Sequence, residues 1–211
     1  MELKEAVETL LKNATKKNFI QTVNLTVNLK GVDLKNPKNR IDEEITLPNG
    51  KGKPVKVALF ATGELAFKAR DVADLVLTDE DMEHLKENKR EAKKIAGNYD
   101  FFLAETTLMS RIGRDLGAIL GPRGKMPRPM PPNADPNVMV GSLRKSVRAR
   151  TKTSPSISLP AGREDMDVDK ICENIRAALS KIESKLERGR DNIESVYISL
   201  TMSDSVRVDR W

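Results

Sequence analysis

Residues 121–132, with the sequence GPRGKMPRPMPP, have the composition of a loop that suits an anionic surface. They contain Arg123, Lys125 and Arg128 together with two glycines and five prolines. Proline fixes φ and lacks a backbone donor, so we expect neither a helix nor a strand here. Glycine allows a close approach to the backbone because it has no Cβ. The segment therefore predicts an anion-binding loop.

The positive charge of the chain is concentrated around this loop. The whole chain has 37 Lys and Arg against 31 Asp and Glu, a net charge of +6. Residues 111–163 alone contain eleven basic and two acidic residues, a local balance of +9. Such a concentration of positive charge favours the binding of phosphate backbones, through an electrostatic contribution that decreases steeply as the salt concentration rises. Charge alone leaves two interpretations open, a nucleic-acid-binding surface and an ordinary solvated basic face.

The side chains that usually carry catalysis or bind metals lack partners in this sequence. A phosphate-binding P-loop needs a glycine and a hydroxyl residue where Ile119 and Met126 stand, so a nucleotide-dependent enzyme is a distant alternative. His84 is the only histidine, and no cysteine near it could complete a metal site. Cys172 lies on an apolar helical stripe and is interpreted as a packing residue. We expect no enzymatic activity, cofactor or metal.

Aromatic residues make up only 4% of the chain, so stacking on splayed bases is poorly supported. A basic, aromatic-poor protein is expected to read folded RNA by its shape, phosphates and 2′-hydroxyl groups. The main alternative is a DNA-binding architectural or regulatory protein, which would show comparable affinity for duplex DNA. The chain start lacks a signal-peptide pattern and no apolar run reaches membrane-spanning length, so we expect a cytoplasmic protein without a membrane partner.

Hydrophobic periodicity predicts an α+β pattern near both ends of the chain and a different pattern between them. Residues 3–17 have apolar side chains at helical spacing, and residues 23–29 alternate as in a strand with one buried face. After residue 62, short apolar strands alternate with helices, the pattern of a sheet with crossover connections. Further predicted helices begin after Thr78 and cover residues 106–116, 137–147 and 167–187; further predicted strands cover residues 40–47, 55–61, 75–77, 101–104, 156–159, 196–200 and 206–208.

Three segments of the sequence resemble one protein family. Residues 19–23 with the strand that follows, residues 120–127, and residues 198–202 followed by 205–208 are similar to the L-one family of large-subunit ribosomal proteins. The resemblance extends over essentially the whole chain. The proline-rich extension through residue 136 resembles the archaeal and eukaryotic branch, and we expect an archaeal protein.

This resemblance implies a two-domain fold of the α+β / α/β class. A discontinuous α+β first domain is expected from residues 1–62 and 156–211, with a Rossmann-like three-layer βα second domain inserted as residues 63–155. Hinges are expected at Thr62 and Gly63 and at Ser154 and Pro155.

The family also implies a function. Its first domain binds a structured rRNA element at the base of the mobile stalk beside the tRNA exit site, so the expected partners are large-subunit rRNA and exit-site tRNA. Many members bind a similar motif in their own mRNA and repress its translation. We therefore expect an rRNA-binding protein with a second role as a translational repressor, monomeric away from the ribosome.

Four expected RNA-contacting residues of the first domain are carried over by position: Phe19, Thr201, Met202 and Ser203. Thr201 would act through its hydroxyl and Met202 by packing against sugar edges. Core filling is the alternative role for Phe19 and Met202. Ser203 and Asp204 stand where the family usually has glycine and proline, and Asp204 would repel a nearby phosphate unless it is turned away.

Four cations complete the expected site. Arg150 and Lys152 lie on the return crossing into the first domain and are expected to contact phosphates. Arg123 and Lys125 are expected to add contacts from the loop of the second domain. Removing the charge of Arg150 or Lys152 should weaken binding and lower its salt dependence by roughly one unit per lost phosphate contact.

Overall fold

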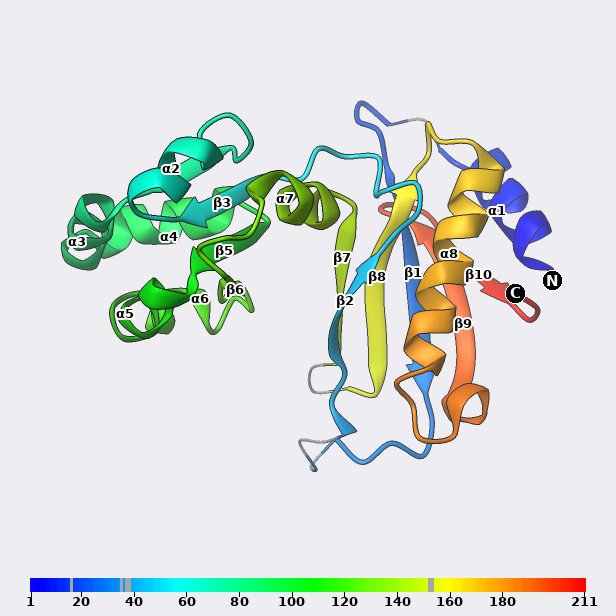
Figure 1. Ribbon diagram of the computed structural model, residues 1–211. Coiled ribbons are helices and arrows are strands. Elements are labelled where there is room, and N and C mark those ends of the chain that lie inside the picture. Colours follow the sequence, from blue (N-terminus) through cyan, green and yellow to red (C-terminus); the bar gives the residue numbers. More distant parts are fainter. Residues whose placement is uncertain (16, 35, 37–38, 152–153) are drawn as a thin grey trace. The chain divides into compact units, whose positions relative to one another are not determined.

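In the computed structural model, which describes residues 1–15, 17–34, 36, 39–151 and 154–211, the chain forms two compact units (Figure 1). Unit 1 combines Met1–Lys53 with Lys145–Trp211, and unit 2 consists of Pro54–Arg144. One unit built from both termini and a second unit inserted into it is the organisation that the family resemblance implies. Both boundaries, however, lie about ten residues earlier than predicted.

Strand pairing explains the earlier boundaries. β3 (Val57–Phe60) falls within the predicted first domain, but it pairs in parallel with β4 (Leu75–Leu77) and β5 (Phe101–Glu105) of unit 2. β7 (Ser146–Arg150) falls within the predicted insertion, but it pairs antiparallel with β2 (Asp42–Thr46) of unit 1. The chain therefore passes between the units next to residues 53 and 144, and the predicted hinge positions lie inside the units.

Unit 1 contains a four-stranded antiparallel sheet with the strand order β10-β9-β1-β8. The predicted alternation of β1 is confirmed, because its odd-numbered residues are buried and its even-numbered residues are partly exposed. β1 pairs with β8 on one side and β9 on the other, so that Asn28 lies opposite both Ser156 and Ser195. The strand bounds are β1 Thr22–Leu29, β8 Ser156–Arg163, β9 Ile193–Leu200 and β10 Val206–Val208.

Two helices cover one face of this sheet. α1 (Leu3–Lys12) and α8 (Val168–Glu183) pack against each other and against the strands (Figure 1). Their apolar stripes join the odd-numbered β1 residues and the β2–β7 ribbon in one hydrophobic core. Both helices are shorter than predicted, with C-caps at Asn13 and Ser184. The other face of the sheet keeps polar, partly exposed side chains.

Unit 2 is a three-layer βα unit, as the family resemblance implies. Its parallel sheet has the order β4-β3-β5-β6 and carries a separate hydrophobic core on each face. Helices α3 to α6 contribute to one core, and α2 and α7 to the other. The remaining bounds are α2 Gly63–Ala69, α3 Asp79–Glu87, α4 Lys89–Asn98, η2 Thr106–Leu108, α5 Met109–Asp115, α6 Gly117–Leu120, β6 Arg128–Met130 and α7 Pro136–Arg144.

The proline-rich segment is not the uninterrupted loop that its composition predicts. Gly124 has a φ of 67°, the left-handed conformation that favours glycine. Residues Arg128–Met130, however, form β6, which pairs in parallel with β5. β6 is the last strand of its sheet, and an edge strand tolerates proline because the missing N–H faces away from the ladder. The expectation that residues 121–132 contain no strand is therefore wrong.

Candidate RNA-binding surface

The segment before β1 and the turn after β9 lie together at one end of the unit 1 sheet. The Thr22 backbone N–H donates to Thr201 Oγ1 at 3.2 Å. The Met202 backbone N–H donates to Gln21 Oε1 at 3.1 Å, across 181 residues of sequence. Folding thus brings together five residues that we call the Thr201 surface: Phe19, Ile20, Thr201, Met202 and Ser203. Four of the five are predicted site residues.

The buried side chain of Gln21 connects the segments that form this surface. Its side chain is 0% exposed and connects two segments, since Oε1 accepts from Met202 N and Nε2 donates to the Thr15 carbonyl at 3.2 Å. Its backbone N–H donates to Glu164 Oε1 at 2.8 Å. The sequence analysis assigned no role to Gln21. The signal was present, because Gln21 occupies the inward phase of the alternation and a buried amide needs partners.

The apolar members of the Thr201 surface are exposed to solvent. Phe19 and Ile20 are each 47% exposed, and Met202 is 58% exposed. Core filling, the alternative role for Phe19 and Met202, is therefore wrong. Exposed large apolar side chains that lie close together are a candidate binding surface. Ile20 has the same exposure as Phe19, and the sequence analysis did not select it.

Thr201 and Ser203 shape the turn through their hydroxyl groups. Thr201 Oγ1 accepts from Thr22 N, so the hydroxyl hydrogen can be donated to a ligand. Ser203 Oγ accepts from Leu200 N at 3.1 Å and donates to the Asp204 carbonyl at 3.1 Å. Among the described residues, no residue other than glycine has a positive φ, so serine replaces the family's glycine here without left-handed strain. The Ser203 side chain therefore stabilises the turn.

A shallow hollow beside the Thr201 surface adds two cations. Its lining is Leu11, Lys12, Ala14, Thr15, Lys17 and Glu164. Thr15 and Glu164 are both hydrogen-bonded to Gln21, which places the hollow next to the turn. Lys12 and Lys17 are exposed, and the sequence analysis gave them no role. Their ammonium groups are candidates for phosphate contacts.

Arg150, the last residue of β7, lies at the opposite end of unit 1 from the Thr201 surface. β7 ends at Arg150, and the chain returns to β8 at Ser156, which pairs with Asn28 at the far end of β1. An eight-residue strand spans roughly 25 Å. Arg150 Nε lies 3.6 Å from Asp42 Oδ2. The structure therefore does not bring Arg150 together with Thr201, and Lys152 lies outside the described residues.

The two predicted cations of unit 2 differ in their surroundings. Lys125 Nζ donates to the carbonyls of Ala96 at 2.9 Å and Tyr99 at 2.6 Å, at the C-terminal end of α4. A cation at that end interacts favourably with the helix dipole and satisfies orphan carbonyls. Arg123 is exposed, and its Nη1 donates to the Ile119 carbonyl at 3.3 Å. The geometry favours a structural role for Lys125 and leaves Arg123 the more accessible of the two.

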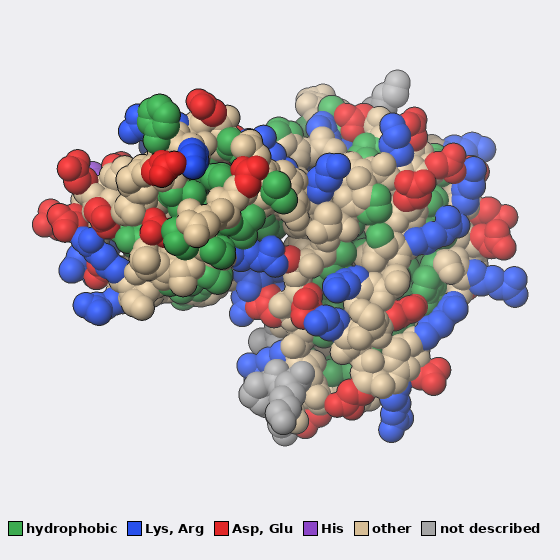
Figure 2. All heavy atoms as spheres, in the orientation of Figure 1, with side chains coloured by type: hydrophobic (Ala, Val, Ile, Leu, Met, Phe, Trp, Pro, Cys, Tyr) green, Lys and Arg blue, Asp and Glu red, His purple; other side chains and the backbone are tan. Residues whose placement is uncertain are grey.

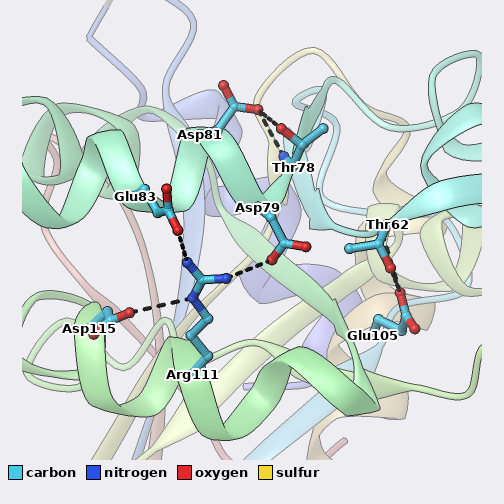
Figure 3. A network of polar contacts seen from close by, with 8 residues as sticks. All are labelled: Thr62, Thr78, Asp79, Asp81, Glu83, Glu105, Arg111 and Asp115. Carbon is cyan, nitrogen blue, oxygen red and sulfur yellow. Dashed lines mark hydrogen bonds and ion pairs between the residues drawn. The ribbon is translucent and has the colours of Figure 1, made fainter.

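The basic excess of residues 111–163 is divided between the two units, and part of it is neutralised by carboxylates. Arg111 lies between Asp79 and Glu83 of α3 at 3.0 and 2.8 Å, with Asp115 of its own helix at 3.8 Å (Figure 3). In unit 1, Arg148 binds Asp42 with two hydrogen bonds of 2.5 and 2.8 Å. Most of these carboxylates lie outside the basic segment of the sequence, so the local balance of +9 overstates the cationic surface.

The helix-covered side of unit 1 likewise has no uniform charge. In Figure 2, Lys and Arg side chains alternate with Asp and Glu side chains over the face that carries α1 and α8. Exposed pairs on this side include Lys4 Nζ with Asp169 Oδ1 at 2.9 Å and Lys185 Nζ with Glu43 Oε1 at 2.6 Å. Charge alone therefore does not identify this face as a site for a polyanion. The Thr201 surface is selected as the candidate site by its apolar and hydroxyl groups.

The position where a Rossmann-like sheet usually binds a nucleotide holds a carboxylate of the protein. Such ligands lie at the carboxyl ends of the strands where the strand order reverses, here between β3 and β5. Glu105 is the last residue of β5 and is 8% exposed. Its Oε2 accepts hydrogen bonds from Thr62 N at 3.2 Å and from Thr62 Oγ1 at 2.8 Å (Figure 3). Its Oε1 accepts from Thr107 Oγ1 at 2.8 Å. The Thr62 hydroxyl, with Thr107, lowers the pKa of Glu105 although burial opposes this. An ionised carboxylate here repels phosphate.

The remaining candidate side chains have ordinary structural surroundings. His84 is on the exposed side of α3, with Nδ1 3.5 Å from Glu91 Oε2. Cys172 is buried in the unit 1 core, and this burial raises the pKa of its thiol, which makes it a poor nucleophile. No cluster of three or more potential metal ligands occurs within the described parts of the chain. In the same parts, no helix has the length and apolar character needed to cross a bilayer.

Comparisons with known proteins identify the family. Residues 10–204 match the model of the ribosomal protein L1p/L10e family. The "Large ribosomal subunit protein uL1" of Thermoplasma acidophilum is 47% identical over 207 residues, which cover 98% of this chain and 95% of the relative. The proteins of the same name from Archaeoglobus fulgidus and Methanothermobacter thermautotrophicus are 47% and 44% identical, over 98% of this chain and 97% and 98% of the relatives. The family match covers most of the chain, and the discontinuous two-unit fold is the one that the family resemblance implies. The chain belongs to the ribosomal protein L1p/L10e family.

Proposed function

We propose that the protein is a structural component of the large ribosomal subunit, located in the cytoplasm, that binds a folded rRNA element through the Thr201 surface of unit 1. Its relatives are named as large-subunit ribosomal proteins and not as enzymes. The observation that carries the proposal is the combination of exposed Phe19, Ile20 and Met202 with the Thr201 hydroxyl on a turn held by buried Gln21. Folded RNA offers matching groups, since its sugar edges are apolar and its 2′-hydroxyls both donate and accept.

The finer assignment follows from the family resemblance. The rRNA element lies at the base of the mobile stalk near the tRNA exit site, and the protein assists the release of deacylated tRNA. The same surface binds a similar motif in the protein's own mRNA and represses its translation. The protein is a monomer away from the ribosome. Arg123 of unit 2 supplies an additional phosphate contact.

A binding experiment with three nucleic acids tests the rRNA proposal. The purified protein is titrated with a folded stalk fragment of large-subunit rRNA, a plain RNA duplex of equal length and duplex DNA, each at two salt concentrations. We expect tight binding to the stalk fragment that survives the higher salt concentration, because shape and apolar contacts are not screened. Equal and salt-sensitive binding to all three would refute the proposal. It would favour a generic basic surface or the alternative of a DNA-binding protein.

Matched phenylalanine variants locate the surface. Phe19→Ala removes an exposed ring of the Thr201 surface, whereas Phe67→Ala removes a 73% exposed ring from unit 2. We expect Phe19→Ala to weaken binding of the stalk fragment by about tenfold, the scale of one lost aromatic contact. Phe67→Ala should leave the affinity unchanged. Equal effects of the two substitutions would show that the Thr201 surface is not the binding site.

A translation assay tests the repressor role separately. A reporter carrying the leader of the protein's own mRNA is translated in a cell-free extract with increasing amounts of added protein. We expect translation of this reporter to fall, while a reporter with an unrelated leader is unaffected. The Thr201→Val variant, which keeps the side-chain shape but lacks the hydroxyl, should repress less well. Repression that Thr201→Val leaves intact would separate the mRNA site from the rRNA site.

A further inference from the structure

The sheet of unit 1 has a face without a helix, and its composition is unusual for an exposed sheet. The side chains that alternate with the buried core residues make up what we call the polar face: Thr22, Asn24, Thr26 and Asn28 of β1, Ser156, Ser158 and Pro160 of β8, Ser195, Tyr197 and Ser199 of β9, and Arg207 of β10. None of these strand positions, all of which the structure describes, carries a carboxylate. Two acids lie at the edges of the face: Glu194 is exposed next to Ser195 at the start of β9, and Asp209 pairs with Arg207.

The polar face is lined by short groups that can both donate and accept hydrogen bonds. Some are linked to one another, since Thr26 Oγ1 donates to Ser158 Oγ at 3.4 Å and Asn28 Nδ2 donates to Ser195 Oγ at 3.0 Å. Hydroxyl and amide groups retain further bonding capacity after one such bond. Short side chains also allow another molecule to approach the sheet closely. The face is therefore accessible and polar, and it does not repel a polyanion.

Tyr197 is the one aromatic side chain on the polar face. It lies near the middle of β9, with Thr26 of β1 opposite on one side and Arg207 of β10 on the other. Arg207 Nε lies 3.1 Å from Asp209 Oδ1, which fixes the guanidinium next to the ring position. A tyrosine combines a large apolar surface with a hydroxyl and loses little entropy on binding. This arrangement offers one anchoring point among the small polar groups.

The polar face is continuous with the Thr201 surface. Thr22, the first polar residue of β1, donates its backbone N–H to Thr201, and Asn24 and Ser199 form the next cross-strand pair. From there the face extends along β1 to Asn28 and Ser195, four residues or roughly 14 Å further along the strand. A duplex bound at Thr201 can therefore continue along the sheet.

Resting on the proposed function, we propose that the polar face is a second contact zone, on which the wide, shallow minor groove of an RNA helix lies. The hydroxyl and amide groups of β1, β8 and β9 contact 2′-hydroxyls, and Tyr197 packs against a ribose. Three observations support RNA as the occupant: the lack of carboxylates among the described strand positions of the polar face, the row of groups that donate and accept, and the continuity with the Thr201 surface. A minor groove that displays 2′-hydroxyls matches such a surface, whereas DNA lacks these groups.

Isosteric charge insertion tests this inference. Asn24→Asp adds a carboxylate to the polar face with almost no change of volume, and Ser180→Asp adds one to the exposed side of α8. We expect Asn24→Asp to weaken binding of the stalk fragment at least about tenfold, because a like charge is brought close to the RNA backbone. Ser180→Asp should have no effect. Circular dichroism and thermal unfolding establish that both variants are folded.

Two further measurements address the chemistry of the contact. Tyr197→Phe should retain most of the affinity and Tyr197→Ser should lose it, if ring packing is the contact. A stalk fragment with 2′-deoxy substitutions should bind the unaltered protein more weakly. The same substitutions should matter less for a variant with Thr26→Ala and Ser199→Ala, because the protein groups that contact the 2′-hydroxyls are gone.

The outcomes separate this inference from the proposed function. Binding of the stalk fragment that is weakened by Phe19→Ala but unchanged by Asn24→Asp and Tyr197→Ser would overturn the polar-face inference alone. Binding that does not distinguish the stalk fragment from plain duplexes would overturn the proposed function as well. Weakened binding by Asn24→Asp and Tyr197→Ser, with reduced sensitivity to 2′-deoxy substitution in the alanine variant, would establish the polar face as a contact zone.

Discussion

Replacement of Gln21 by leucine tests whether the Thr201 surface depends on its buried support. The substitution keeps an approximately similar volume but removes the acceptor for Met202 N, 3.1 Å away, and the donor to the Thr15 carbonyl, 3.2 Å away. Leaving one buried backbone group unpaired costs about 1–3 kcal/mol. Met202 and Thr15 are exposed residues, so water can replace part of each bond. We therefore expect a loss of unfolding free energy of about 1–3 kcal/mol for the two bonds together.

The larger effect of Gln21→Leu should be on RNA binding. Without Gln21 Oε1 the turn that carries Met202 loses its tie to the segment that carries Phe19, and the two halves of the surface must be ordered by the ligand. Ordering a few side chains costs about 0.5–1.5 kcal/mol each, so the affinity for the stalk fragment should fall by roughly ten- to a hundredfold. Urea unfolding and fluorescence titration with the RNA measure the two quantities separately.

Asn174 offers a matched control in the same unit. Its side chain is also 0% exposed; Oδ1 accepts from Asn49 N at 3.0 Å, and Nδ2 donates to the carbonyls of Gly50 and Ala161, both at 2.8 Å. Asn174→Leu should therefore destabilise unit 1 at least as much as Gln21→Leu while leaving the affinity for RNA unchanged. If Gln21→Leu binds RNA as the unaltered protein does, or if the two variants lose affinity equally, the role assigned to Gln21 is wrong.

Three other substitutions test assignments made from single contacts. Lys125→Met should lower the unfolding free energy by about 1–2 kcal/mol through the loss of two bonds at the end of α4, without changing the salt dependence of RNA binding; a lower salt dependence would restore its predicted phosphate contact. Arg150→Gln should lower that salt dependence by roughly one unit if the guanidinium binds a phosphate, whereas an unchanged slope would leave Asp42 as its only partner of consequence. The lowered pKa of Glu105 stabilises the folded state above the ordinary carboxyl value of 4.5. This stabilisation is lost as the pH falls through the lower folded-state pKa, so acid unfolding should be less steep in Glu105→Gln than in the unaltered protein.

Several features of the fold could be predicted because they depend on local periodicity. The alternation along residues 23–29 predicts β1 with its buried face, and the change of pattern after residue 62 predicts the βα unit. The domain boundaries could not be located in the same way. β3 and β7 are assigned to a unit by the strands with which they pair, and pairing partners are distant in the sequence.

The candidate site likewise combines residues that could be predicted from the sequence with contacts that only the folded chain creates. The resemblance selected Phe19, Thr201, Met202 and Ser203, which the structure brings together, and Arg150, which it places at the opposite end of unit 1. Gln21 was within reach of sequence reasoning, because a glutamine in the inward phase of a strand must find partners in the core. Its partners Thr15 and Met202 were not, since only the folded chain brings those segments to it.

The sequence by itself determined the family, the class of fold and the chemistry of the strands, because residue types and short-range periodicity are properties of the chain. It also determined that charge is abundant near residues 111–163. Only the tertiary structure decided which charges remain available: Arg111 is neutralised by Asp79 and Glu83, and Arg148 by Asp42. The reason is physical, since the electrostatic potential depends on distances in space and a carboxylate remote in sequence cancels a cation when folding places it within about 3 Å.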